Sequence, residues 1–257
     1  MSKSLVLYHS DFNGLWVKNS DGDLKEACET FDELIITSAD TGNVGYRTMK
    51  MRVDDILTRL KPGTKVALGT SSLTTEEPYK PCLKTFQSLY PELEFTGVYF
   101  NEESFLHPRF YRIWRELNKI KEDKIWIPYT GSWSKSLLTL PQIALLSRKF
   151  QRVYVQPNFY QERYGKDVLS TREACGMMRF IQNHKLGIEF EIDEYAFTDD
   201  KWAMIRALGY FAMLSIYGDI EKKAFYVGGL GLLELKALSF DWDSEHALDY
   251  YAELRKL

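Results

Sequence analysis

The chain has 257 residues, of which 45% are hydrophobic and 27% charged, and its formal net charge is -3 at pH 7. This composition excludes a disordered or fibrous protein and supplies enough apolar side chains for one large globular core. Lysine and arginine are spread along the chain rather than clustered, which argues against nucleic acid as a partner.

Cysteine usage and the apolar segments bear on the compartment. The 3 cysteines, Cys28, Cys82 and Cys175, are odd in number and lack metal-ligand spacing, so we expect no disulfide framework and a reducing environment. The apolar run near the amino terminus is too short for a signal peptide, and residues 207–217 are too few to cross a membrane. We therefore expect a cytoplasmic protein that no membrane segment anchors.

Short β-branched and aromatic runs alternate along the chain with longer helical patterns. The expected strands cover residues 5–9, 33–38, 65–69, 97–100, 124–129, 152–156, 188–192 and 224–227. The expected helices cover residues 24–31, 48–60, 81–90, 109–120, 142–150, 171–183, 201–217 and 246–257. Eight β/α units in about 250 residues predict an α/β fold, a single (β/α)8 TIM-type barrel over residues 1–257 with a parallel eight-stranded sheet. An open doubly wound sheet is the alternative.

In such barrels the active site lies at the carboxyl ends of the strands. The residues that follow the expected strands are mostly carboxylates, amides and aromatics. This mixture suits a carbohydrate, because sugar hydroxyls need polar partners and pyranose faces stack on aromatic rings. The candidate substrate-binding residues are Asp11, Asp40, Asn101, Glu103, Tyr129, Trp133, Gln156, Asn158, Tyr160 and Asp193. We expect no metal or cofactor, because the 4 histidines lack zinc spacing and no phosphate-binding loop motif is present.

Two acidic stretches are the strongest chemical signals. The apolar run that starts at Phe95 breaks into Asn101, Glu102 and Glu103, which would serve chemistry or cap the following helix. In residues 187–193, period-two alternation places three carboxylates on one face of a strand. Inward carboxylates are costly unless paired or solvated. We therefore expect Glu191 and Asp193 to be functional, and Glu189, deeper in the strand, to be held by a buried lysine or arginine.

Four segments resemble the hallmark segments of the domain-of-unknown-function family four-eight-five-five, whose members are thought to be glycosidase-like barrels. They are Gly97-Val98-Tyr99-Phe100-Asn101-Glu102-Glu103, Trp126-Ile127-Pro128-Tyr129, Gln156-Pro157-Asn158-Phe159 and Gly187-Ile188-Glu189-Phe190-Glu191. The resemblance covers the central and later part of the chain and implies a barrel fold.

A broader resemblance implies a reaction. Asn101-Glu102 after the fourth strand and Glu191 at the seventh look like the large glycoside hydrolase clan in which an Asn-Glu pair supplies the acid/base and a later Glu the nucleophile. We expect these strands to face each other, so that Glu102 and Glu191 flank one glycosidic bond of an oligo- or polysaccharide. Because Glu103 follows directly, either residue of the pair is a candidate for the acid.

Two further readings stay open. The first is a non-catalytic carbohydrate-binding or regulatory barrel. The second is a phosphosugar or nucleotide-sugar enzyme that uses the glycine loop Gly228-Gly229-Leu230-Gly231, because barrels often bind phosphate with the loops after the last strands. The sugar, the linkage, the stereochemical outcome and the oligomeric state are also open.

Overall fold

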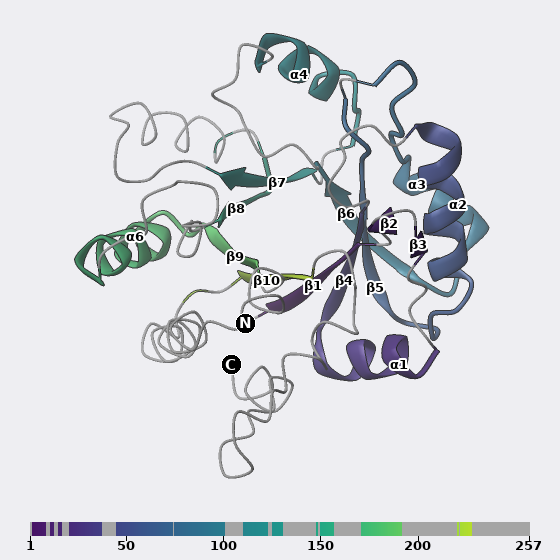
Figure 1. Ribbon diagram of the computed structural model, residues 1–257, viewed down its shortest axis with the longest axis horizontal. Coiled ribbons are helices and arrows are strands. Elements are labelled where there is room, and N and C mark those ends of the chain that lie inside the picture. The colour runs from purple at the N-terminus through teal and green to yellow at the C-terminus, as the bar shows by residue number, and fades with distance from the viewer. Residues whose placement is uncertain are drawn as a thin grey trace.

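The fold is seen in a computed structural model of the protein (Figure 1). The structure describes residues 2–8, 11–12, 15–16, 21–37, 45–73, 75–100, 110–122, 125–130, 148, 150–156, 171–191, 220 and 222–227. Within these residues strands and helices alternate, as the sequence predicts.

Eight strands pair with one another in a closed ring (Figure 1). They are β1 (Ser2–Tyr8), β4 (Glu33–Thr37), β5 (Lys65–Gly69), β6 (Glu94–Tyr99), β7 (Ile125–Thr130), β8 (Arg152–Gln156), β9 (Gly187–Glu191) and β10 (Lys222–Val227). Around the ring the order is β1-β10-β9-β8-β7-β6-β5-β4, and each neighbouring pair is parallel. The predicted α/β class and parallel sheet are therefore confirmed, and the open doubly wound sheet is excluded.

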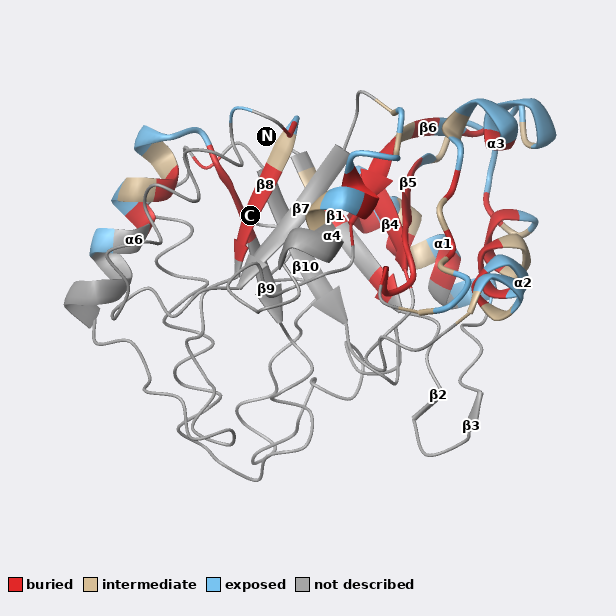
Figure 2. Ribbon diagram, turned by 90° about the horizontal axis from the view of Figure 1, so that it is seen from above, coloured by how far each residue is buried: buried red, intermediate tan, exposed pale blue. Residues whose placement is uncertain are grey.

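The described helices lie outside this closed sheet (Figure 1). They are α1 (Asp21–Thr30), α2 (Tyr46–Leu57), α3 (Leu83–Leu89), α4 (Phe110–Leu117) and α6 (Thr171–Asn183). In α2, Met49, Val53 and Ile56 are buried with the spacing of one helix face, and Figure 2 shows this side turned toward the strands. None of the described helices is long and apolar enough to cross a membrane.

Three of the predicted helices lie partly or wholly outside the described residues. Of residues 142–150 only Arg148 is described as helical, and residues 201–217 and 246–257 lie outside the described residues. That each of the eight strands is followed by a helix therefore stays a prediction.

A small hairpin between β1 and α1 is an addition to the predicted elements. It pairs β2 (Asp11–Phe12) with β3 (Leu15–Trp16) in antiparallel fashion, with Asp11 opposite Trp16. Each strand has 2 residues, too few for any periodicity to reveal them in the sequence.

The core follows from the strand sequences. All five residues of β4, Glu-Leu-Ile-Ile-Thr, are buried, as expected for a strand covered by helices on one side and by other strands on the other. The largest fully buried side chains include Tyr79, Tyr99 and Tyr154. Figure 2 shows the buried residues concentrated on the strands and on the helix sides that face them.

The direction of the β4 side chains is fixed by a bond across the ring. β4 and β8 lie opposite one another, with three strands between them on either side. The Arg152 guanidinium of β8 nevertheless donates to the Glu33 carboxylate of β4 over 2.9 Å. The Glu33 side chain therefore points into the interior of the ring of strands. Because side chains alternate along a strand, Ile35 and Thr37 lie on the same inner face.

Candidate functional site

Parallel strands in one closed sheet all end at the same rim, so the carboxyl ends of β1, β4–β10 form one edge. Three of the predicted site residues lie in the last part of these strands. Glu191 is the last residue of β9 and is in register with Tyr226 of β10. Gln156 is the last residue of β8 and pairs with Thr130, while Tyr129 pairs with Val155. Their backbone positions agree with the predicted rim.

The other predicted site residues are placed differently. Asp11 belongs to the β2–β3 hairpin that follows β1. The remaining predicted residues lie outside the described residues, and they are Asp40, Asn101, Glu102, Glu103, Trp133, Asn158, Tyr160 and Asp193.

One part of the geometric prediction is wrong. The fourth and seventh strands of the ring, β6 and β9, do not face each other directly. Two strands, β7 and β8, separate them on one side, and four strands separate them on the other. The reason is simple counting in a ring of eight, where the strand opposite β6 is β10. The ends of β6 and β9 lie on the same rim, three strand positions apart rather than four.

The described part of the rim is rich in buried hydroxyl groups. Thr37 ends β4, and Thr70, Ser71 and Ser72 follow β5, each with at most 6% of its surface exposed. The Ser71 hydroxyl accepts a hydrogen bond from the Tyr79 amide over 2.7 Å, and the Ser71 amide donates to the Tyr79 carbonyl over 3.2 Å. This pair of bonds closes the loop after β5 against the rim.

Thr37 differs from its neighbours in its hydrogen bonding. It is 1% exposed, and among the described residues its hydroxyl has no hydrogen-bond partner. Gly69, at the end of the adjacent strand, makes room for the Thr37 side chain. A Cβ atom on Gly69 would lie 2.3 Å from Thr37 Cβ and 2.4 Å from Thr37 Oγ1, far inside contact distance.

The loop after β5 is also tied to the outer helices. Lys80 donates to Glu116 of α4 over 2.8 Å, and Lys119 donates to the same carboxylate over 2.6 Å. These hydrogen bonds lower the pKa of Glu116 to about 2. Burial, with Asp54 and Tyr46 nearby, raises the pKa of the Tyr79 hydroxyl well above its usual range, so this buried phenol stays neutral.

A polar cluster fills the inside of the sheet at its amino end. The Glu33 carboxylate accepts from the Ser4 hydroxyl over 2.8 Å as well as from Arg152, and Arg152 also donates to the Tyr154 hydroxyl over 3.3 Å. Burial works to lower the pKa of Arg152, but Tyr154 and Glu33 outweigh it and the pKa is raised. Burial raises the pKa of Tyr154 to about 12. The Glu189 side chain, for which a buried lysine or arginine partner was expected, lies outside the described residues, so that expectation stays a prediction.

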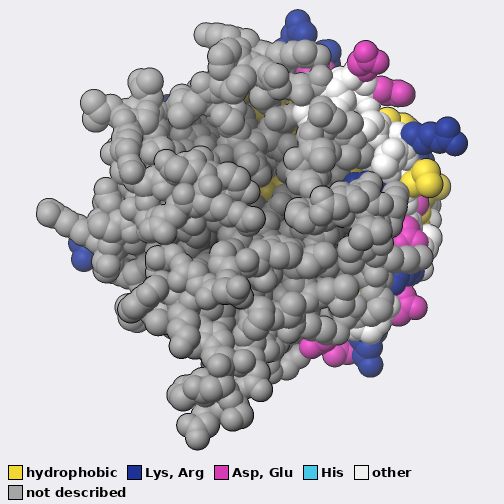
Figure 3. Space-filling view, viewed as in Figure 1, with side chains coloured by type: hydrophobic (Ala, Val, Ile, Leu, Met, Phe, Trp, Pro, Cys, Tyr) yellow, Lys and Arg dark blue, Asp and Glu magenta, His cyan; other side chains and the backbone are white. Residues whose placement is uncertain are grey.

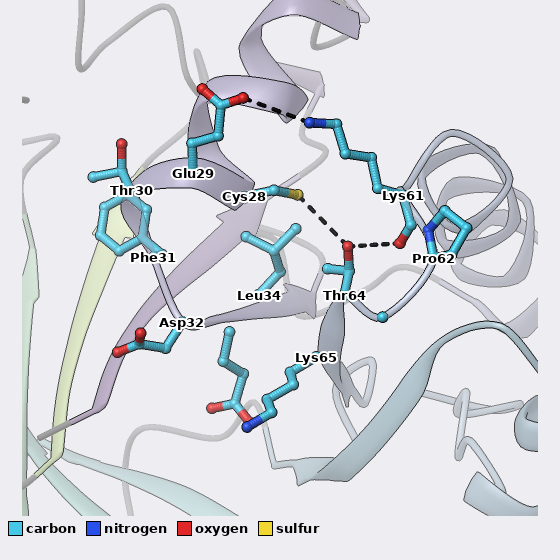
Figure 4. A pocket seen from close by; sticks show the side chains of 12 residues that line it. Cys28, Glu29, Thr30, Phe31, Asp32, Leu34, Lys61, Pro62, Thr64 and Lys65 are labelled. Carbon is cyan, nitrogen blue, oxygen red and sulfur yellow. Dashed lines mark hydrogen bonds and ion pairs between the residues drawn. The ribbon is translucent and has the colours of Figure 1, made fainter.

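A cavity of about 390 Å³ opens near this amino end, between the end of α1 and the turn before β5 (Figure 4). Lys61 and Glu29 form an ion pair of 3.5 Å at its edge, and Thr64 lies 3.9 Å from the Cys28 sulfur. Burial raises the pKa of the Cys28 thiol, which makes it less reactive. The cavity lies at the end of the sheet opposite to the rim, and it is not the site that the sequence predicts.

The charges around these elements are mixed. Figure 3 shows acidic and basic side chains interspersed along the described edge of the molecule, in keeping with the small net charge. In the part of the chain that the structure describes, no three histidine, cysteine, aspartate or glutamate side chains gather as metal ligands would.

Sequence reasoning missed Thr37 and Gly69 as neighbours at the rim. The predicted strand ended at Ser38, one residue too late, and nothing in the sequence shows that Thr37 and Gly69 are neighbours. The contact depends on the register of β4 with β5, in which Ile36 pairs with Leu68. Only that register brings the two residues together.

The solved structures that this chain resembles include dihydropteroate synthases. The enzyme from Xanthomonas albilineans, in complex with indole-2-carboxylic acid and 6-chloroguanine, is 12% identical over 92% of this chain and 90% of its own, with a TM-score of 0.47. The Thermus thermophilus enzyme in complex with 6HMPPP is 11% identical over 92% of each chain, with a TM-score of 0.43. The Anaplasma phagocytophilum enzyme with bound 6-hydroxymethylpterin-monophosphate is 12% identical over 91% of this chain and 97% of its own, also at 0.43. Such likeness is too weak to carry an argument about this chain.

No curated protein sequence matches the chain. The sequence profile of a domain of unknown function, DUF4855, matches residues 79–251, a stretch that includes β6 to β10 and is more than half of the chain. The family that the four sequence segments resemble is thus the one whose profile matches, and the chain belongs to the DUF4855 family.

Proposed function

We propose that the protein is a one-domain (β/α)8 barrel and a retaining glycoside hydrolase, with Glu102 as acid/base and Glu191 as nucleophile. The observation that carries this proposal is the position of β9 in the closed parallel sheet. β9 ends at Glu191, in register with Tyr226, so the backbone of this residue lies at the rim where barrels hold their active sites.

The position of β6 supports the acid/base role in the same way. β6 ends at Tyr99, is parallel to its neighbours, and is followed directly in the chain by Phe100, Asn101 and Glu102. The chain thus leaves the sheet at the same rim, and the proposal assigns the amide of Asn101 and the two carboxylates that follow it to that rim. Both acidic stretches also fall within the region that defines the family.

The two carboxylates would divide the work of hydrolysis. One carboxyl group, kept protonated, gives its proton to the leaving oxygen, while the other attacks the anomeric carbon and forms a glycosyl ester that water then cleaves. A retaining mechanism needs the groups about 5–5.5 Å apart, whereas an inverting one needs roughly 6.5–9.5 Å. β6 and β9 end at one rim of the closed sheet, so the separation of the two carboxyl groups there decides between the mechanisms.

The other predicted rim residues would hold the carbohydrate. Tyr129 of β7 and Gln156 of β8 lie near the ends of adjacent strands, one residue apart in register, and the proposal assigns both to the carbohydrate. The hydroxyls of Thr37, Thr70, Ser71 and Ser72 add neutral hydrogen-bonding groups on the opposite part of the ring. Neutral donors and acceptors suit sugar hydroxyls better than phosphate, which recruits cations.

The test is a panel of 4-nitrophenyl glycosides and natural oligosaccharides, assayed with the wild type and with Glu191→Gln, Glu102→Gln and Glu103→Gln. Glu191→Gln should abolish turnover of every glycoside. Glu102→Gln should lose roughly a hundred- to ten-thousandfold in rate on poor leaving groups while sparing the first step with good ones, because those depart without a proton. Glu103→Gln should be much milder if Glu102 is the acid.

Glu94→Gln is the matched control. Glu94 is exposed at the amino end of β6, the strand that precedes Glu102 in the chain, so this substitution should leave activity unchanged. Full activity in Glu191→Gln would remove that residue from the mechanism. A wild-type protein that binds an oligosaccharide but cleaves no member of the panel would replace the hydrolase with a carbohydrate-binding barrel. Binding of phosphosugars alone would favour the glycine loop after β10.

A further inference from the structure

We propose that the Thr37 hydroxyl is a ligand-binding group of the rim and that it hydrogen-bonds to a hydroxyl of a neutral carbohydrate. This inference rests on the proposed function and adds to it a residue that the sequence did not reveal. Thr37 is the last residue of β4, and it lies on the inner face of the closed sheet together with Glu33, whose carboxylate meets Arg152 inside the ring.

The first step of the argument is the missing partner. Thr37 is 1% exposed, yet among the described residues its hydroxyl makes no hydrogen bond. A buried hydroxyl without a partner is destabilising, so such groups in folded proteins usually bind water or a ligand, or serve function in another way. A position at the carboxyl end of a strand, on the inner face, is where a ligand would supply the partner.

The second step is the space that Gly69 leaves for the Thr37 side chain. Any side chain at position 69 would collide with Thr37, because a Cβ there would lie 2.4 Å from Thr37 Oγ1 and 2.8 Å from Thr37 Cα. Gly69 ends β5, and a glycine in a strand often marks a place where a ligand or another part of the backbone approaches closely. An unpartnered hydroxyl beside such a close contact lowers stability at one point of the rim, which is typical of functional rather than purely structural positions.

The third step concerns the class of ligand. A threonine hydroxyl offers one donor and two acceptor lone pairs and carries no charge, which matches another hydroxyl group. The hydroxyls of Thr70, Ser71 and Ser72 follow the neighbouring strand and extend the same neutral chemistry. The Ser71 hydroxyl is already engaged by the Tyr79 amide, which leaves Thr37 as the better placed of these two groups.

The experiment compares Thr37→Val with Thr30→Val. Both substitutions exchange a hydroxyl for a methyl group of the same shape. Thr30 is the matched control, because it too is buried, at 6% exposure, and its hydroxyl has no partner among the described residues, but it ends α1 at the other end of the sheet. The ligand-free proteins should therefore be as stable as the wild type or more stable in both cases.

The two variants should differ when a sugar is present. With the 4-nitrophenyl glycoside or oligosaccharide that the wild type binds best, Thr37→Val should raise KM or Kd by roughly two- to tenfold, the value of one ordinary hydrogen bond. Thr30→Val should leave both constants unchanged. Thr37→Ser, which keeps the hydroxyl, should restore most of the affinity.

Equal affinity in Thr37→Val and the wild type would overturn this inference and leave the proposed function standing. A marked loss of stability in ligand-free Thr37→Val, absent from Thr30→Val, would also overturn it, because the hydroxyl would then have a partner within the protein. If the wild type binds no carbohydrate of the panel, the proposed function fails first and this inference fails with it.

Discussion

Arg152 and Glu33 are joined by a 2.9 Å ion pair across the inside of the sheet, although 119 residues separate them in the sequence. Glu33 is the first residue of β4 and Arg152 the first residue of β8, and these two strands lie opposite one another in the ring. The pair therefore links the two halves of the closed sheet at its amino end. Only 4% of the Glu33 side chain and 19% of the Arg152 side chain are exposed, so solvent screens the interaction little.

Removing either partner alone should strongly destabilise the protein. Glu33→Gln or Arg152→Met leaves one buried charge without its partner, and the expected loss in the free energy of unfolding is about 3–5 kcal/mol. The double variant Glu33→Gln/Arg152→Met should recover much of this loss, because no buried charge remains. Urea unfolding of all four proteins gives the coupling energy. Additive losses in the double variant would mean that the two side chains act independently.

The Tyr154 hydroxyl should make stability fall at alkaline pH. Its pKa is raised to about 12 in the folded protein, chiefly by burial, against 10.0 for an unburied tyrosine. Below pH 10 the phenol is neutral in both states, whereas between pH 10 and about 12 the unfolded chain loses a proton that the folded protein keeps. Stability is therefore lost as the pH rises through this window, by about 1.4 kcal/mol per pH unit for one group.

Tyr154→Phe tests this directly. Its free energy of unfolding should fall less steeply than that of the wild type above pH 10, in urea titrations at several pH values. Tyr79 also has a raised pKa because of burial, so some alkaline dependence should persist in the variant. An unchanged slope in Tyr154→Phe would show that this phenol does not ionise differently in the two states.

Much of the fold could be predicted because the strands are continuous apolar runs with clear ends. Residues 65–69 and 152–156 were predicted with the bounds that β5 and β8 have, and residues 171–183 with those of α6. Gly63, in the turn before β5, has the positive φ of 81° that favours glycine. The start of β6 was predicted three residues late, because Thr96 is an extra residue where the pairing of β5 with β6 shifts register.

The candidate site was predictable only in its general place. Strand ends indicate which residues come to the rim, and Glu191 and Gln156 do end their strands. Contacts between distant residues depend on register and ring order, which local patterns do not contain. This is why the Thr37–Gly69 contact was missed. The expectation that β6 and β9 face each other had another cause, because the predicted barrel already implies a sequential ring in which the strand opposite β6 is β10.

Glu116 should make stability fall at acidic pH. Its hydrogen bonds from Lys119 and Lys80 lower its pKa to about 2, against 4.5 for an unperturbed glutamate. The stability from these bonds is fully present above pH 4.5 and is lost as the pH falls toward 2, because the unfolded chain takes up the proton first. Glu116→Gln should be less stable than the wild type at pH 6, and the difference should vanish near pH 2.

Lys80→Met is the companion variant for this prediction. It removes the bond that ties the loop after β5 to α4 and should reproduce part of the stability difference at pH 6. Thermal unfolding at pH 2, 3, 4 and 6 measures both effects. A constant difference between Glu116→Gln and the wild type over this range would mean that the carboxylate contributes through packing and not through its charge.

Two glycine-to-alanine substitutions should shift stability in opposite directions. Gly69→Ala introduces a Cβ that would lie 2.3 Å from Thr37 Cβ and 2.8 Å from Thr37 Cα, and since the second atom belongs to the backbone, no change of rotamer relieves the clash. Pushing β4 and β5 apart at the rim should cost about 1–3 kcal/mol. Gly176 lies within α6, is exposed, and has no atom within 4 Å of where a Cβ would stand, so Gly176→Ala should stabilise the helix by about 1 kcal/mol. Urea unfolding of the two variants measures both shifts against the same chemical change. A destabilised Gly176→Ala would contradict the open environment of that position, and an unaffected Gly69→Ala would show that β4 and β5 are not as close at the rim as the Thr37–Gly69 contact requires.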